Sequence, residues 1–371
     1  MKKILAVLLA LAMVFTLAAC GEKEEAQTEA PAFAVAMITD YGDITDESFN
    51  QATYEGCKEF CEANGVNFNY YKPAGDSDAE RVAMIDAAIA DGFNVIVTPG
   101  YAFAGALKET VGTYPDAYFI ALDVSEGDFG DFEIPANLFS AVYQEELCGY
   151  MAGVAAVKLG YKHVGFLGGM AVPAVVRYGY GFVQGANAAA EELGLTDVVC
   201  EYGYGNQFFG DADITAVMDT WYQTLGVEVV FACGGGIYTS AAEAAAKVGG
   251  KVIGVDVDQV PTIDGTYGAG MTVTSAMKGL AATVKTLLTE LILNNNWSAY
   301  GGTITKLGLV SGTDTAANYV QLGTTQWADG FTEADYQALV AAMFDGSVKV
   351  SDSIDAMPTT TITVNDHGNV K

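Results

Sequence analysis

The sequence predicts an α/β protein built from two doubly wound parallel-sheet lobes. Short β-rich segments alternate with longer helical segments along most of the chain, which is the pattern of βαβ units. Most of the β-rich segments are continuous apolar runs, as expected for parallel strands covered by helices on both faces. About four strand–helix units precede residue 140 and about four follow it, which favours two similar lobes over one oversized sheet.

Eight segments are predicted to be strands because they are short, apolar and rich in β-branched residues. They are Ala34–Thr39, Val66–Tyr71, Asn94–Thr98, Ala117–Leu122, Lys162–Leu167, Val198–Tyr202, Val227–Ala232 and Lys251–Val255. The segments between them have helical patterning. These are residues 46–62, 77–91, 102–113, 143–160, 173–193, 210–224 and 237–247.

The chain is expected to cross between the lobes several times, which makes a hinge. The segment Met271–Val273 and a helix from Ser275 to Asn294 are predicted to return to the first lobe. The N-terminal lobe would then comprise residues 33–138 plus about 276–310, and the C-terminal lobe residues 139–275 plus about 311–371. Ligands of such sheets bind beyond the carboxyl ends of the strands, here in a cleft between the lobes.

The charge balance excludes several functional classes. The chain has 17 Lys and Arg against 46 Asp and Glu, for a formal net charge of −29. Such a surface repels phosphate backbones, so a nucleic-acid partner is not expected. Hydrophobic residues make up 51% of the chain, which excludes disorder for most of it. The two histidines are too few for a His-rich metal site.

The first residues are predicted to be a targeting signal. Lys2 and Lys3 precede the apolar stretch from Ile4 to Ala19, which is short for a membrane span and suits a signal peptide. The stretch ends in LAAC, which resembles the lipobox of bacterial lipoproteins. Residues 1–19 are therefore predicted to be a lipoprotein signal peptide, with lipid attached to Cys20 on the extracytoplasmic face of the cell membrane. Residues 20–32, the lipidated cysteine and a polar acidic stretch, would form a flexible tether.

The first strand leads into a group of polar and aromatic residues. Asp40 follows the strand, and a Gly turn then leads into a helix opening with Asp46, Phe49 and Asn50. Asp46 is interpreted as a helix cap. For Asp40, Phe49 and Asn50, the combination of a carboxylate, an aromatic face and an amide favours a ligand-binding role.

Two later strands also end in residues suited to a ligand site. VVFACGGG runs into three glycines, including Gly235, which let backbone approach a ligand closely. It is not a P-loop, because no Lys-Ser/Thr pair follows the glycines. VIGVDVDQ carries two carboxylates, Asp256 and Asp258, near its end. Because side chains alternate between the two faces of a strand, these two residues need not point toward the same metal ion, and no metal site is predicted. Lys278 is expected in the first turn of the next helix, an unfavourable place for a cation that indicates a partner.

Five segments together carry a family resemblance. ITDYGDITDESFNQATYEG, VGFLGGM, VVFACGGG, VIGVDVDQ and VTSAMKGL resemble the BMP (basic membrane lipoprotein) family of ABC-transporter substrate-binding proteins, which includes the PnrA-like purine nucleoside receptors. The resemblance runs from about Phe33 to about Leu280. It implies the type I periplasmic-binding-protein fold, two α/β lobes joined by three crossovers. It also implies a binding protein without cofactor or catalytic residues.

The resemblance implies specific ligand contacts. Asp40 matches the residue that binds the edge of the base, and Phe49 matches the aromatic that stacks on the purine. Asp256 and Lys278 match the residues that hold the ribose hydroxyls.

A second aromatic completes the stack in members of the family. Phe231 is the expected match, with Phe208 and Tyr178 as alternatives, and Asn50 and Gly235 are further candidates for ligand contact. This sequence departs from the family at Ala171, where an acidic residue is common, and in the stretch after Gly100. Both departures are expected to lie at the cleft, where the base specificity is set.

The expected function is capture of purine nucleosides by lobe closure and delivery to an ABC permease, by a monomer. Other small neutral ligands, such as a sugar, riboflavin or another heterocycle, and a role as a signalling sensor remain alternatives. A nucleoside hydrolase is disfavoured, because the sequence contains no nucleophile elbow, Cys-His pair or clustered Asp quartet.

Overall fold

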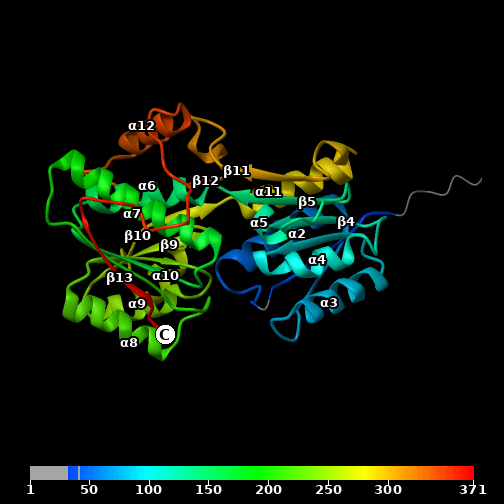
Figure 1. Ribbon diagram of the computed structural model, residues 1–371, viewed down its shortest axis with the longest axis horizontal. Coiled ribbons are helices and arrows are strands. Elements are labelled where there is room, and N and C mark those ends of the chain that lie inside the picture. Colours follow the sequence, from blue (N-terminus) through cyan, green and yellow to red (C-terminus); the bar gives the residue numbers. More distant parts are fainter. Residues whose placement is uncertain (1–31, 41) are drawn as a thin grey trace, which may run out of the picture. The chain divides into compact units, whose positions relative to one another are not determined.

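The computed structural model describes residues 32–40 and 42–371. The expected signal peptide, Cys20 and nearly all of the expected tether therefore lie outside the described residues. The described chain forms two mainly parallel sheets, each covered by helices on both faces (Figure 1). In this part of the chain, no helix is both long and apolar enough to span a bilayer.

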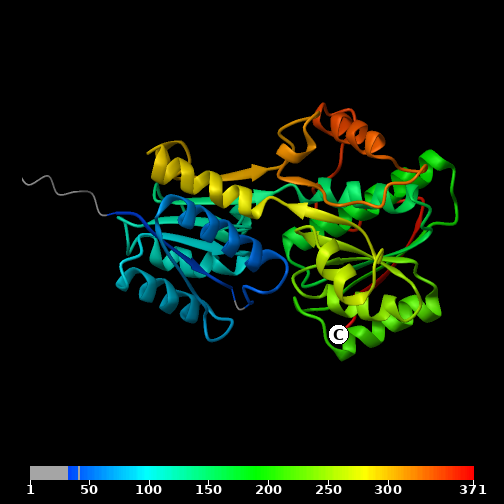
Figure 2. The same cartoon turned by 180° about the vertical axis from the view of Figure 1, so that it is seen from behind.

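The N-terminal lobe contains a six-stranded, fully parallel sheet with the order β11-β5-β4-β3-β1-β2. Its strands are β1 (Ala34–Ile38), β2 (Asn67–Tyr71), β3 (Val95–Pro99), β4 (Tyr118–Leu122), β5 (Leu138–Tyr143) and β11 (Thr303–Leu307). Helices α2 (Phe49–Asn64) and α11 (Leu280–Leu288) lie side by side on one face (Figure 2). Helices α3 (Asp78–Ala90) and α4 (Ala104–Thr110) cover the other face.

The C-terminal lobe contains a seven-stranded sheet with the order β12-β10-β9-β8-β6-β7-β13, in which only β12 is antiparallel. Its strands are β6 (His163–Gly168), β7 (Val199–Tyr204), β8 (Val229–Cys233), β9 (Lys251–Asp256), β10 (Thr272–Lys278), β12 (Val320–Leu322) and β13 (Thr363–Asn369). Helices α6 (Glu145–Lys158) and α7 (Pro173–Leu193) cover one face, and α8 (Ala212–Asp219) and α9 (Tyr238–Ala246) the other.

The remaining helical segments complete the structure. They are α5 (Glu126–Phe129), α10 (Val260–Tyr267), α12 (Glu333–Phe344), the π-helical segments Thr220–Leu225 and Thr289–Leu293, and the 3-10 turns Tyr101–Phe103, Trp297–Ala299 and Thr315–Ala317.

The two sheets repeat one topology. The order β2-β1-β3-β4-β5 in the first sheet matches β7-β6-β8-β9-β10 in the second. In each sheet the strand order reverses beside the first strand of the lobe, and open α/β sheets bind ligands at the carboxyl ends of strands near such a point. The loops that follow these strands are therefore the places to look for a ligand site.

Glycines allow α6 and α7 to pack closely. A Cβ atom on Gly149 of α6 would lie 2.1 Å from the carbonyl oxygen of Tyr178 in α7, and one on Gly185 of α7 would lie 2.1 Å from the carbonyl oxygen of Tyr150. Any larger residue at these positions would push the two helices apart. The packed pair covers the second sheet, with α6 against β10 and β12 and α7 against β6 and β8.

The chain passes between the lobes three times, as the fold prediction requires. The crossovers lie at Gln144, between β5 and α6; at Gly279, between β10 and α11; and in residues 308–319, between β11 and β12. Backbone hydrogen bonds hold them close together. Gly279 N donates to Tyr319 O of the third crossover (2.7 Å), Tyr319 N donates to Gly308 O within that crossover (3.0 Å), and Gln144 N donates to Leu307 O, the last residue of β11 before it (2.9 Å). The hinge is thus a narrow group of adjacent segments.

The structure corrects the expected elements in two places. The helix predicted to begin at Ser275 begins instead at Leu280, because residues 275–277 pair with β9 and so extend strand β10 to Lys278 before the chain crosses at Gly279. Strand β5, which the sequence analysis assigned to the second lobe from residue 139 onward, pairs with β4 in the first sheet. Strands β5, β11, β12 and β13 were not predicted.

Candidate ligand-binding site

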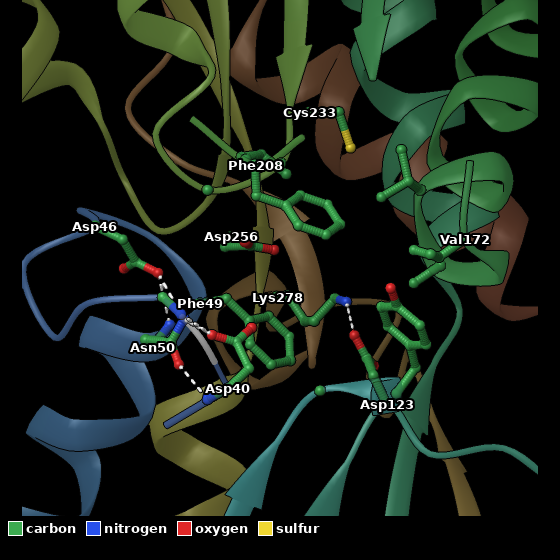
Figure 3. Close-up of a pocket in the computed structure, with 18 of the residues that line it drawn as sticks. Asp40, Asp46, Phe49, Asn50, Asp123, Val172, Phe208, Cys233, Asp256 and Lys278 are labelled. Atoms are coloured by element: carbon green, nitrogen blue, oxygen red, sulfur yellow. Dashed lines mark hydrogen bonds and ion pairs between the residues drawn. The ribbon is translucent and has the colours of Figure 1, made fainter. Parts of the chain in front are cut away.

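A cavity of about 420 Å³ lies at the carboxyl ends of strands from both sheets, within the size range of small-molecule sites. In the first lobe, its walls come from the segments after β1, β2, β3 and β4 and from the start of α2. In the second lobe, they come from the last residues of β8, β9 and β10, the loops after β6, β7 and β8, and the first turns of α7. Figure 3 shows the polar and aromatic side chains that converge there. The lining residues are Asp40, Gly42, Asp43, Asp46, Phe49, Asn50, Lys72, Gly100, Tyr101, Asp123, Ser125, Asp128, Val172–Val175, Arg177, Tyr178, Phe208, Phe209, Cys233–Gly236, Val255, Asp256 and Lys278.

Asp40 lies directly after β1 and is held by its neighbours. Its Oδ1 accepts hydrogen bonds from Gly42 N (2.5 Å) and from Asn50 Nδ2 (3.1 Å) (Figure 3). Burial raises the pKa of Asp40 to about 6, although these two hydrogen bonds oppose the shift. The sequence analysis predicted both Asp40 and Asn50 as ligand residues, and the structure places them together at the pocket.

Asp46 caps helix α2, as the sequence analysis interpreted it. Its Oδ1 accepts from Ser48 N (2.9 Å) and Gln51 N (3.0 Å), and its Oδ2 accepts from Asn50 N (2.9 Å) and Asn50 Nδ2 (3.1 Å). These bonds satisfy backbone donors at the start of the helix. They also fix the first turn, which carries Phe49 into the pocket.

Lys278 lies at the centre of the buried charges. It is the last residue of β10 and not, as the sequence analysis expected, part of the first turn of a helix, which begins at Leu280. Its side chain is only 2% exposed. Its Nζ lies 2.7 Å from Asp123 Oδ2 and 3.0 Å from Glu145 Oε1. The same atom lies 5.2 Å from the ring centres of Phe49 and Tyr143, within cation–π range. The partner that the sequence analysis expected for Lys278 is therefore a pair of carboxylates.

The neighbours of Lys278 extend this network. Arg177 Nε donates to Glu145 Oε2 at 2.6 Å. Burial acts to raise the pKa of Glu145, but Lys278 and Arg177 outweigh it, so the pKa is lowered. Burial raises the pKa of Asp123, with Lys278 opposing. Lys278 and Arg177 thus keep the buried carboxylate of Glu145 ionised beside the pocket.

Asp123 is a pocket residue that the sequence analysis missed. It follows β4 with a left-handed backbone (φ 60°), a conformation that is costly for a residue other than glycine. Its Oδ1 is buried and accepts no hydrogen bond from any described residue, which leaves an acceptor at the pocket. A carboxylate directly after an apolar strand was the signal that identified Asp40, and the same signal is present at Asp123.

Asp256 also has a left-handed backbone (φ 63°), at the end of β9. Its Oδ2 accepts a 2.5 Å hydrogen bond from Ser48 Oγ of the other lobe. Burial raises the pKa of Asp256, and Lys278 opposes the shift. Asp258 does not join it: its Oδ2 accepts from Thr324 Oγ1 (2.5 Å), and it is not a lining residue. Among the described residues, no cluster of three or more His, Cys, Asp or Glu is arranged to hold a metal.

Phe231 is not a pocket residue. It is fully buried in β8, with its ring against Phe166, Tyr178 and Phe182. The strand is covered on both faces, so a side chain in its middle packs into the core and not at its carboxyl end. Both alternatives, Phe208 after β7 and Tyr178 in α7, line the pocket from the second lobe, as does Phe209. Tyr178 is only 2% exposed, whereas Phe208 is half-buried and so offers the more accessible ring.

The glycine turn after β8 seats Phe208. A Cβ on Gly235 (φ 52°) would lie 2.6 Å from Phe208 O, and one on Gly169 would lie 2.4 Å from Phe208 Cδ1. Gly236 N donates to Phe208 O at 2.9 Å. The close backbone approach that the glycines allow is therefore to the Phe208 loop, and Gly235 also lines the pocket.

The two departures noted in the sequence lie at and beside the pocket. Gly100 and Tyr101 line it, whereas Ala171 is exposed and adjacent to the lining residue Val172. In all, six aspartates and three cations line the pocket. This balance suits a ligand that carries no negative charge.

Comparisons with known proteins identify the family of the chain and its fold. A family model described as ABC transporter substrate-binding protein PnrA-like (Bmp) matches residues 33–313. The ABC transporter nucleoside-binding protein BmpA of Lactococcus lactis is 28% identical over 275 residues, 70% of this chain and 74% of its own. Basic membrane protein B of Borreliella burgdorferi is 26% identical over 313 residues, 80% of this chain and 84% of its own. A solute-binding protein of an ABC transporter from Aeropyrum pernix has the same fold, with a TM-score of 0.65 and 21% identity over 85% of this chain and 87% of that chain.

Proposed function

Because the chain belongs to the Bmp family of ABC-transporter substrate-binding proteins, we propose that it captures a purine nucleoside in the pocket between its lobes. Its class is that of an extracytoplasmic solute-binding protein and not of an enzyme. The observation that carries the proposal is the pairing of phenylalanines: Phe49 of the first lobe and Phe208 of the second line the same pocket (Figure 3).

The two rings provide apolar faces for a planar base. Stacking of a base on an aromatic side chain contributes roughly 1–3 kcal/mol and tolerates different bases. Asp40, beside Phe49, supplies carboxylate oxygens for the edge of the base. Because the pKa of Asp40 is about 6, this group accepts hydrogen bonds at neutral pH and becomes a donor in mild acid.

The sugar would be held by the charged end of the pocket. Asp256 and Lys278 are the residues expected to bind the ribose hydroxyls, and Asp123 joins them with its buried Oδ1. A hydroxyl group that donates to Asp123 would satisfy this acceptor. A ligand without the hydroxyl would leave it unsatisfied, at a cost of about 1–3 kcal/mol.

Capture would proceed by closure of the lobes about the three crossovers, followed by delivery of the nucleoside to the permease of an ABC importer. We expect a monomer held at the extracytoplasmic face of the membrane by lipid on Cys20. Labelled fatty acid should be incorporated into the wild-type protein and not into a Cys20→Ala variant. Incorporation into that variant would contradict the lipid anchor while leaving the ligand proposal intact.

Native mass spectrometry followed by calorimetry tests the ligand. The purified protein should retain or bind guanosine, adenosine or inosine and leave each of them intact. Phe208→Ala should weaken binding by roughly 1–3 kcal/mol, whereas Phe344→Ala, a half-exposed position in α12, should leave it unchanged. A retained sugar or another heterocycle, with no nucleoside binding, would contradict the proposal, and release of free base would indicate an enzyme.

A further inference from the structure

Two of the sequence motifs meet outside the pocket. The turn before α2, in the motif DESFNQ, belongs to the first lobe, and the segment after β9, in the motif GVDVDQ, belongs to the second. Three hydrogen bonds join them: Ser48 Oγ to Asp256 Oδ2 (2.5 Å), Gln259 Nε2 to Glu47 O (2.9 Å) and Thr262 Oγ1 to Glu47 Oε2 (3.0 Å). Glu47, Ser48, Gln259 and Thr262 are not among the residues that line the pocket.

Each side of this contact is held in place by its own lobe. Asp46 fixes the backbone of Ser48, and Glu47 N donates to Gln51 Oε1 at 3.0 Å. Gln259 is fully buried, with Oε1 accepting from Val255 N (2.9 Å). Its amide is therefore oriented so that Nε2 points across to the other lobe.

Backbone strain marks the same contact. Glu47 has a φ of 52° and Asp256 a φ of 63°. A left-handed conformation is unfavourable for a residue with a side chain. In this conformation, Glu47 accepts hydrogen bonds from the second lobe with both its carbonyl oxygen and its carboxylate. A simple turn into a helix would not need a left-handed residue at this position.

The contact also reaches the pocket through one residue. Asp256 lines the pocket and receives the Ser48 hydrogen bond. That bond fixes the rotation of the carboxylate, and it forms only when the two lobes are together. Ser48 thus connects the orientation of a ligand-binding group with the position of the lobes.

We propose that Glu47, Ser48, Gln259 and Thr262 form a closure latch that stabilises the closed arrangement of the lobes from outside the pocket, and that Ser48 is a positioning residue for Asp256. The proposal rests on the proposed function in that closure accompanies ligand capture. It gives a role to the Gln of GVDVDQ and to the residues before Phe49, which ligand contact alone leaves unexplained.

Interlobe distances measured by spin labelling test the latch without a ligand. Labels are attached at Ala83→Cys in α3 and Ala246→Cys in α9, both exposed positions, in a Cys20→Ala background. The five other cysteines are buried and should remain unlabelled. Without nucleoside, the closed fraction should fall in Ser48→Ala and in Thr262→Val. It should be unchanged in Thr113→Val, whose hydroxyl donates within its own lobe to Glu109 O.

Binding kinetics with guanosine provide the second measurement. Each latch variant should dissociate guanosine about threefold to tenfold faster, the effect of one lost hydrogen bond, with little change in the association rate. Melting temperatures of all variants check that they fold. Equal closed fractions in wild type, Ser48→Ala and Thr262→Val would overturn the latch. If guanosine fails to bind but the closed fractions shift, the proposed ligand fails and the latch stands.

Discussion

Lys278 places an ammonium group within 3.0 Å of two buried carboxylates, at the end of a strand with no exposed face. Burying a charged group is costly unless it is paired, and the loss of one partner leaves the other uncompensated. We therefore expect Lys278 to contribute to folding stability, in addition to its proposed contact with the ribose hydroxyls.

Replacement of Lys278 should destabilise the protein without any ligand. Lys278→Met leaves Asp123 and Glu145 without their shared cation, so the free energy of unfolding should fall by about 3–5 kcal/mol. Lys247→Met is the matched control, since its side chain is 41% exposed and its pairs are at the surface; it should cost at most about 1 kcal/mol. Urea denaturation measures both. Equal losses of unfolding free energy in the two variants would show that the buried ion pairs of Lys278 stabilise the protein no more than a surface pair does.

Asp40 should make stability depend on pH. Burial raises its pKa from 3.8 to about 6, so the folded protein keeps a proton that the unfolded chain releases between these values. The ionised carboxylate therefore costs stability above about pH 6, and the cost fades as the pH falls toward 4. Asp40→Asn should raise the melting temperature more at about pH 8 than at about pH 5.

Asp345→Asn is the control for this pH effect. Asp345 is exposed, and its hydrogen bond from Ser347 lowers its pKa, so it is ionised at both pH values. Its replacement should change the melting temperature equally at the two. A pH-independent effect of Asp40→Asn would mean that Asp40 is not desolvated in solution.

The sequence analysis could predict pocket residues that lie at or soon after the carboxyl end of a predicted strand. Asp40, Phe49, Asn50, Gly235, Asp256 and Lys278 all line the pocket, but their contacts with a ligand remain predictions. Phe231 was misplaced because a one-dimensional pattern does not tell the middle of a buried strand from its end. Phe208 lies in a loop, and only the three-dimensional glycine turn shows why its ring is held there.

At the scale of elements, the close packing of α6 on α7 predicts the effect of a single added methyl group. Gly149→Ala would place a methyl group 2.1 Å from Tyr178 O, so the helices must separate, at a cost of about 1–3 kcal/mol. Gly265 lies in α10, where an added Cβ would have no neighbouring atom within 4 Å. Gly265→Ala should therefore stabilise the protein by about 0.5–1 kcal/mol.

Thermal denaturation tests both predictions, because the melting temperature should fall in Gly149→Ala and rise in Gly265→Ala. A stabilising Gly149→Ala would contradict the close packing of α6 on α7. A destabilising Gly265→Ala would show that α10 does not behave as an ordinary exposed helix.

Seven of the eight predicted strands are mostly buried runs, whereas β2 is a half-exposed edge strand and the buried run of β5 was missed. All eight lie within two residues of the observed strands. The missed strands β11 and β13 are edge strands with mostly exposed or half-exposed polar residues, so their sequence carries no burial pattern. Strand β10 was cut short because Thr274 and Ser275 resemble a helix cap, while pairing with β9 extends the strand to Lys278.

At the scale of the whole molecule, net charge should discriminate among ligands. The chain has a formal net charge of −29, and six aspartates and three cationic side chains line the pocket. A nucleoside monophosphate should bind at least about tenfold more weakly than its nucleoside, about 1.4 kcal/mol. The difference should shrink as salt is added, because salt screens the charges at the mouth of the pocket.

Parallel titrations of inosine and its monophosphate, at low and high salt, measure this difference. The neutral nucleoside is its own control, because its affinity should change little with salt. Equal affinities at low salt would indicate that Lys72, Arg177 and Lys278 form a phosphate site that outweighs the surrounding carboxylates.

The position of β11 and β13 in the sheets has a consequence for how the chain acquires its structure. The first sheet is completed by residues 303–307 and the second by residues 363–369. A chain that emerges N-terminus first, from a ribosome or through a membrane pore, therefore cannot complete the first sheet until four-fifths of it has appeared, or the second until almost all of it has. During that interval the edges of β5 and β7 are unpaired, and such edges favour association between chains. Protection by chaperones would matter most before the last few residues arrive.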